Sequence, residues 1–190
     1  EALNAGQTGY TPTPGIPQLR KAICEKLEKE NGLKYTPDQI CVNIGAKHSI
    51  YEAMQAVLDP GDEVILPCPY WVTYPETIKL ADATAKIIET SIETGYKVTP
   101  EQLKAAITKK TAMFVLNSPN NPGGFSYSEK ELKALAEVLK GTNIIVLSDE
   151  IYERLVYGTQ KFVSFASLSS DTYARTLTVN GFSKAYAMTG

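Results

Sequence analysis

Lys184 stands near the C-terminal end of the sequence in a setting that suits a reactive amine. It follows residues 176–180, which alternate β-branched and apolar side chains and predict a short buried strand. Small and apolar residues surround it. A lysine held beyond the end of a strand with little bulk around it can form a Schiff base with a carbonyl compound. The alternative is a solvated lysine at the start of a helix, and the rest of the chain has to decide between the two.

The elements that must position this lysine alternate between strands and helices along the whole sequence. Short apolar runs predict strands, whereas apolar residues at helical spacing and capping residues such as Thr99 and Ser128 predict helices. Because the strands are almost continuously apolar, the pattern predicts an α/β fold with a mostly parallel sheet and helices on both faces, in three α/β/α layers. Strands are expected at 40–42, 64–66, 85–89, 112–116, 144–147 and 176–180, and helices at 16–31, 45–58, 76–80, from 99 onward and from 128 to 139.

Polar or aromatic residues follow five of these predicted strands. In open α/β sheets, ligands bind beyond the carboxyl ends of the strands, and parallel strands share that edge. We therefore expect these residues to lie close together. Taken singly, each has an ordinary interpretation, such as packing for Trp71, helix capping for Asp149 or a turn for Asn121. The residues are Ala46 and Lys47 at a helix start, Trp71, Asn121, Asp149 with Tyr152, and Lys184.

Pyridoxal phosphate needs the chemistry that this set could supply. Its aldehyde takes a lysine as Schiff-base partner, and its ring nitrogen needs a carboxylate to keep it protonated. Lys184 and Asp149 fit these two roles. Tyr152 and Asn121 could hydrogen-bond the phenolic oxygen of the ring and tune the pKa of the imine. Once a substrate amine displaces it, Lys184 would be free to act as general base and general acid.

Two further contacts complete the predicted cofactor site. Trp71 could stack on the face of the ring. The phosphate could lie on the helix N-terminus at Ala46 and Lys47, where backbone amides point outward. This helix start lacks the P-loop pattern, so it is not predicted to bind a nucleotide.

The composition of the 190 residues is that of an ordinary globular protein, with 43% hydrophobic and 21% charged residues. The net charge is −2 and no basic stripe is visible, which argues against a nucleic acid partner. No apolar run approaches membrane-spanning length, so no membrane partner is expected. Cys24, Cys41 and Cys68 show neither pairing nor metal spacing, and no metal site is expected. These cysteines fit a reducing compartment, and a cytoplasmic location is predicted.

Five motifs occur in a fixed order along the chain. They are Gly45-Ala46-Lys47, Pro69-Tyr70-Trp71, Ser118-Pro119-Asn120-Asn121-Pro122, Ser148-Asp149-Glu150-Ile151-Tyr152, and Ser183-Lys184 with Met188-Thr189-Gly190. Together they resemble the fold-type I, class I aminotransferases that use pyridoxal phosphate, over essentially the whole chain. The runs 59–64 and 177–184 are most similar to bacterial and plastid aspartate aminotransferases, some of which also accept prephenate. The resemblance implies that residues 1–190 are the large cofactor-binding domain, truncated at both ends and without the small domain, and makes a plastid the alternative location.

By this resemblance the protein is expected to transfer the amino group of an L-amino acid, most of all aspartate, to a 2-oxo acid such as 2-oxoglutarate or prephenate. Lys184 would be the catalytic Schiff-base lysine. Asn121 and Trp71 would also lie near the substrate carboxylate. Tyr10 would reach the phosphate of the neighbouring subunit, in a homodimer with shared active sites. Gly181 stands where many relatives have a serine that contacts the phosphate.

Other functions fit the same residues. A lyase or decarboxylase with this fold and cofactor would share them, because in the family substrate choice depends largely on parts outside this sequence. A non-catalytic fragment would keep the fold without turnover, although an intact Lys184 and Asp149 favour a working site. A nucleotide-binding doubly wound protein is a distant alternative, because no Gly-x-Gly-x-x-Gly follows a strand.

Overall fold

The chain divides into two compact units, residues 1–43 and 44–190, and each is described by itself. The structure, a computed structural model, describes residue 1 and residues 3–189, so Gly190 of the last motif lies outside the described residues. Within this described part, no helix is both long and apolar enough to cross a membrane.

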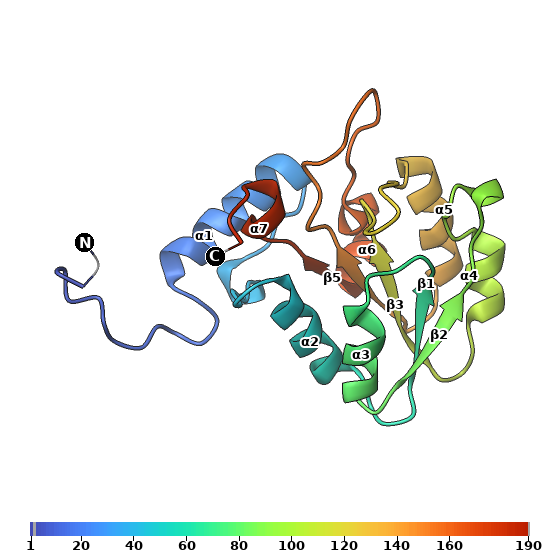
Figure 1. Cartoon of the computed structure of the whole chain (residues 1–190), viewed down its shortest axis with the longest axis horizontal. Helices are drawn as coiled ribbons and strands as arrows, with labels where there is room; N and C mark the ends of the chain where they lie inside the picture. Colours follow the sequence, from blue (N-terminus) through green and yellow to red (C-terminus); the bar gives the residue numbers. More distant parts are fainter. Residues whose placement is uncertain (2, 190) are drawn as a thin grey trace. The chain divides into compact units, whose positions relative to one another are not determined.

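A five-stranded parallel sheet forms the centre of the second unit (Figure 1). Its spatial order is β2-β1-β3-β4-β5. The order reverses at β1, because β2 adds to one side of β1 and the later strands add to the other. In open α/β sheets, ligands bind beyond the carboxyl ends of the strands at such a reversal. The strands are β1 (Glu63–Pro67), β2 (Thr84–Ile88), β3 (Thr111–Asn117), β4 (Ile145–Asp149) and β5 (Thr176–Val179).

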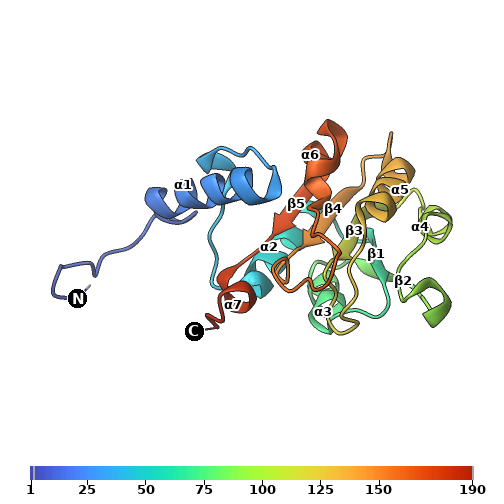
Figure 2. The same ribbon diagram turned by 90° about the horizontal axis from the view of Figure 1, so that it is seen from above.

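Helices cover both faces of this sheet (Figure 2). Residues of α2 and α3 share one buried cluster with the strands, and residues of α4 and α5 share a second cluster with the opposite side. In β3, Met113 and Val115 belong to the first cluster, whereas Phe114 and Leu116 belong to the second. The predicted parallel sheet with helices on both faces is therefore confirmed. The helices are α2 (Ala46–Val57), α3 (Thr73–Leu80), α4 (Pro100–Ala106), α5 (Glu129–Leu139), α6 (Ser170–Arg175) and α7 (Phe182–Ala185).

Capping residues start α4 and α5 where the sequence predicts them. Thr99 accepts a hydrogen bond from the amide of Gln102 (3.2 Å), and Pro100 occupies the first helical position of α4. Ser128 accepts one from the amide of Glu131 (3.4 Å) at the start of α5. Each cap satisfies an amide that has no partner within the first helical turn.

The first residues of α2 lie at the edge of the sheet where the parallel strands end. Residues 58–62 join the end of α2 directly to the start of β1. The C-terminal end of α2 therefore lies at the edge where the strands begin, and its N-terminus lies at the opposite edge. Ala46 packs against the buried cluster on this face. The chain topology thus brings the start of α2 to the same edge as Asp149.

The first unit contains one longer helix, α1 (Pro17–Lys26), which continues as a π-helical turn at Leu27–Asn31. The helix ends at Gly32, whose left-handed conformation (φ 70°) glycine adopts without strain. The predicted helix over 16–31 is confirmed.

The predicted strand at 40–42 is wrong. These residues pair with no strand among those the structure describes. The amide of Val42 instead donates a hydrogen bond to the carbonyl of Pro14 (3.0 Å). An apolar run becomes a strand only when a second backbone lies beside it, and the local sequence carries no information about that partner.

Candidate active site

Asp149 ends β4 and is almost completely buried, with 3% of its surface exposed. The hydroxyl of Tyr74 donates a hydrogen bond to its Oδ2 (2.6 Å), and the amide of Ile151 donates one to its Oδ1 (3.1 Å). Burial raises the pKa of Asp149, although these two hydrogen bonds act in the opposite direction. The alternative role of Asp149 as a helix cap does not apply, because the segment that follows it is a turn.

Asn121 and Tyr152 lie side by side, since the Asn121 side-chain amide donates a hydrogen bond to the Tyr152 hydroxyl (3.3 Å). Asn117, the last residue of β3, holds Asn121 in place by accepting its backbone amide (2.9 Å). The side-chain amide of Asn117 in turn donates to the carbonyl of Asp149 (3.0 Å). Three predicted site residues are therefore connected through Asn117, which the sequence analysis missed.

Trp71 follows β1 and makes contacts in two directions. The ammonium of Lys47, at the start of α2, lies 4.9 Å from the centre of the Trp71 ring, a cation–π contact. The ring of Tyr74 meets it edge-on at 6.0 Å between ring centres. Gly45, the N-cap residue of α2, has no side chain that could cap the first amides of the helix, and the amides at a helix start attract anions. Trp71 is partly buried and keeps part of its surface accessible.

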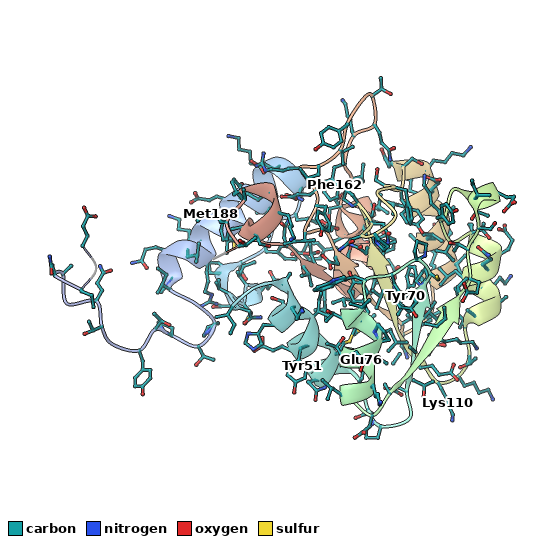
Figure 3. The ribbon with its side chains drawn as sticks, in the orientation of Figure 1. Tyr51, Tyr70, Glu76, Lys110, Phe162 and Met188 are labelled. Atoms are coloured by element: carbon teal, nitrogen blue, oxygen red, sulfur yellow. The ribbon has the colours of Figure 1, made fainter. Side chains whose placement is uncertain are left out.

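Lys184 lies on the short helix α7, five residues after β5 ends at Val179, and it is exposed. The exposed Met188 (64%), labelled in Figure 3, follows α7. Gly181 lies directly against the segment after Asp149, because a Cβ built there would meet Ile151 Cδ1 at 3.0 Å. This close approach means that the end of the Ile151 side chain would have to shift for a larger residue at position 181. It also brings the start of α7 next to the turn that follows Asp149.

Tyr10 belongs to the first unit and is fully exposed. Its contact with a neighbouring subunit stays a prediction.

Tyr74 is the second residue that the sequence analysis missed. It lies in the first turn of α3, which begins three residues before the predicted helix at 76–80. Its place three residues after Trp71, just inside the start of α3, was the one local signal, and the two rings do meet. Its hydrogen-bond partner is 75 residues away and could not be read from local sequence.

Glu150, next to Asp149, is buried with 1% of its surface exposed. Its Oε1 accepts hydrogen bonds from the hydroxyls of Ser148 and Ser164 (both 2.8 Å) and from the amide of Phe165 (3.2 Å). Within the described part of the chain, its Oε2 has no hydrogen-bond partner. Burial raises the pKa of Glu150 to about 7 despite the three hydrogen bonds. Glu150 ties the end of β4 to residues 164–165 and so closes the segment that carries Tyr152.

Comparison with known proteins gives aminotransferases in each case. The family model described as aminotransferase class I and II matches residues 1–190. The chain is 52% identical over 190 residues to an aspartate/prephenate aminotransferase of Cereibacter sphaeroides. It is 48% identical over 190 residues to an aspartate aminotransferase of Geobacillus stearothermophilus. Each alignment covers 100% of this chain and 48% of the relative.

A solved structure is also similar. The crystal structure of an aspartate aminotransferase from Rhizobium meliloti matches with a TM-score of 0.96 and 46% sequence identity, covering 100% of this chain and 48% of that one. The chain therefore spans about half the length of the relatives that it matches.

Proposed function

The chain belongs to the class I and II aminotransferases, as its motifs predict, and from this premise we propose that the whole protein transfers an amino group from an L-amino acid to a 2-oxo acid. Aspartate is the proposed donor and 2-oxoglutarate the proposed acceptor, with prephenate as a second acceptor, on the likeness to relatives named for aspartate and prephenate. The observation that carries the proposal is the connected set of Asp149, Asn121 and Tyr152 at the carboxyl edge of the sheet.

Pyridoxal phosphate is the proposed cofactor, and the donor set fits its polar groups. Asp149 offers a buried carboxylate to a protonated ring nitrogen. Asn121 and Tyr152 offer an amide and a phenol to the oxygen on the ring. Trp71 offers an aromatic face. The start of α2, with Lys47, offers amides and a positive charge to the phosphate.

When bound, pyridoxal phosphate supplies an aldehyde that captures an amine and a ring that draws electrons from the adjacent carbon. Lys184 would supply the protein's own amine to this aldehyde. With a substrate amine in its place, Lys184 Nζ would take the proton from the substrate α-carbon and deliver it to a new position. Asp149 would keep a proton on the ring nitrogen, while Asn121 and Tyr152 would fix the orientation of the ring.

Reductive labelling tests this proposal. The whole protein is incubated with pyridoxal phosphate and reduced with borohydride, and the labelled peptide is mapped by mass spectrometry. We expect the label on Lys184 and its loss in Lys184→Ala. Lys130→Ala is the control, because it removes an exposed lysine of α5 that has no place in the proposed cofactor site, and it should leave the label on Lys184. No label on Lys184, in protein that circular dichroism shows to be folded, would overturn the cofactor assignment.

Product analysis separates the proposed reaction from that of a lyase or decarboxylase of the same fold. The loaded whole protein, given aspartate and 2-oxoglutarate, should form oxaloacetate and glutamate in equal amounts. Release of carbon dioxide or ammonia from aspartate without formation of glutamate would favour the other reaction class.

The remaining proposals concern the whole protein. We expect residues 1–190 to act as the large cofactor-binding domain and the protein to form a homodimer in which Tyr10 reaches the partner's phosphate site. Light scattering at assay concentration would test the dimer. A cytoplasmic location, with a plastid as alternative, stays a prediction.

A further inference from the structure

Tyr74 has no role in the chemistry proposed above, yet it makes the shortest hydrogen bond to Asp149. It lies in the first turn of α3 with 1% of its surface exposed. Its hydroxyl is 2.6 Å from Asp149 Oδ2, across 75 residues of sequence. The bond therefore connects α3 to the end of β4 directly at the candidate site.

The direction of this hydrogen bond follows from the surroundings of the tyrosine. Burial, the charge of Asp149 and the charge of Tyr152 all raise the pKa of Tyr74 above its ordinary value. The phenol therefore keeps its proton and donates a hydrogen bond to the carboxylate. Bonds from a hydroxyl to a carboxylate at about 2.5–2.7 Å are charge-assisted and roughly twice as strong as neutral ones. Tyr74 thus favours the ionised form of Asp149, which burial disfavours.

The same contact fixes the orientation of the carboxylate. The Ile151 amide holds Oδ1 from the turn after β4, and Tyr74 holds Oδ2 from α3. Each carboxylate oxygen can accept about two hydrogen bonds, so each keeps room for one more donor. A protonated ring nitrogen is a donor of this kind.

We propose that Tyr74 is a positioning residue that keeps Asp149 ionised and oriented, and thereby sets how tightly the protein holds the protonated ring nitrogen of pyridoxal phosphate. This inference rests on the proposed function. A tyrosine that only stabilised the fold would affect every ligand of the site alike. A positioning tyrosine affects only a ligand that carries the ring nitrogen.

Tyr74→Phe isolates the hydroxyl, because phenylalanine keeps the ring within the buried cluster and against Trp71. The dissociation constants of two ligands are measured by equilibrium dialysis with the whole protein. One ligand is pyridoxal phosphate, and the other is its deaza analogue, in which carbon replaces the ring nitrogen. We expect Tyr74→Phe to weaken binding of pyridoxal phosphate about tenfold relative to the analogue, the effect of a hydrogen bond to a charged group. Equal weakening of both ligands, or of neither, would overturn the inference.

Tyr127→Phe is the matched control. Tyr127 is also buried (4% exposed), and its hydroxyl accepts a hydrogen bond from the amide of Val98 (2.9 Å), in the cluster on the opposite face of the sheet. Its replacement should change the two dissociation constants by the same factor. A selective loss of pyridoxal phosphate binding in Tyr127→Phe would also contradict the inference, because it would show that the discrimination does not depend on contact with Asp149.

The wild-type protein separates this inference from the proposed function. If the unaltered protein binds no pyridoxal phosphate, the proposed function fails and the inference fails with it. If it binds pyridoxal phosphate while Tyr74→Phe leaves the ratio of the two dissociation constants unchanged, only the inference fails. Should Tyr74→Phe not fold, 3-fluorotyrosine at position 74 keeps the ring and makes the hydroxyl a stronger donor. The affinity for pyridoxal phosphate should then rise relative to the analogue, and an unchanged ratio would refute the proposal.

Discussion

Glu150 makes the free energy of unfolding depend on pH, and Glu150→Gln should remove that dependence. Glutamine has nearly the same shape as the protonated acid, and its side-chain oxygen can accept the hydrogen bonds that Ser148, Ser164 and Phe165 donate to Oε1. The variant therefore represents the protein with Glu150 permanently neutral. Any difference between the two proteins that changes with pH reports the charge on this one side chain.

The size of the effect follows from the pKa of Glu150, which burial raises from 4.5 to about 7. Each unit of difference between the folded-state and unfolded-state pKa corresponds to about 1.4 kcal/mol. Ionisation of Glu150 therefore costs the folded protein about 3 kcal/mol. The folded-state pKa lies above the unfolded-state pKa. The stability that the neutral Glu150 side chain contributes is therefore fully present below pH 4.5 and is lost as the pH rises through about 7. Glu150→Gln should match the wild type near pH 4.5 and exceed it by about 3 kcal/mol near pH 8.

Urea unfolding followed by circular dichroism between pH 4.5 and 8.5, on the whole protein without added cofactor, measures this difference. Glu101→Gln is the control, because Glu101 is exposed on α4, and its difference from the wild type should stay within about 0.5 kcal/mol at every pH. The buried carboxylates Asp149 and Glu153 are present in both proteins, so their own contributions largely cancel. A constant difference between Glu150→Gln and the wild type over the whole range would refute the reasoning.

Two predictions concern stability. Phe114→Ala removes a side chain with 0% exposure from the cluster under α4 and α5, and should lower the free energy of unfolding by about 4 kcal/mol in urea titrations. A loss below about 1 kcal/mol would show that the core collapses around the cavity. Ser128→Ala removes the cap of α5 and should cost about 1 kcal/mol. Ser126→Ala, two residues earlier and outside the helix, should stay within about 0.5 kcal/mol, and equal losses in both variants would contradict the capping argument.

The sequence predicts most of the fold because the determining signals are local. Residues 112–116 are apolar without interruption and form the centre of β3, buried on both faces. Thr99 and Ser128 mark helix starts through bonds that span three residues. The failed strand at 40–42 had the right composition, but a strand also needs a partner, which is a tertiary property.

Local signals likewise predict one part of the candidate site and not the other. Residues that follow strands could be identified because parallel strands end at one edge, and the structure connects Asp149, Asn121 and Tyr152 there. Tyr74 and Asn117 support them through bonds over 75 and 32 residues, and neither bond leaves a local pattern in the sequence. The groups that bind could be predicted, whereas the groups that hold them in place could not.

The order of the strands allows the sheet to grow while the chain is being synthesised. After β1 and β2 have paired, β3 adds to the free side of β1, and β4 and β5 each add beside the strand made just before. A ribosome adds about 5–20 residues per second, so Asp149 emerges about 4–15 s after Tyr74. Helix α3 can therefore dock on the first strands before its carboxylate partner exists, and Lys184 emerges after all five strands. The five strands that carry the candidate site are therefore synthesised before the reactive amine.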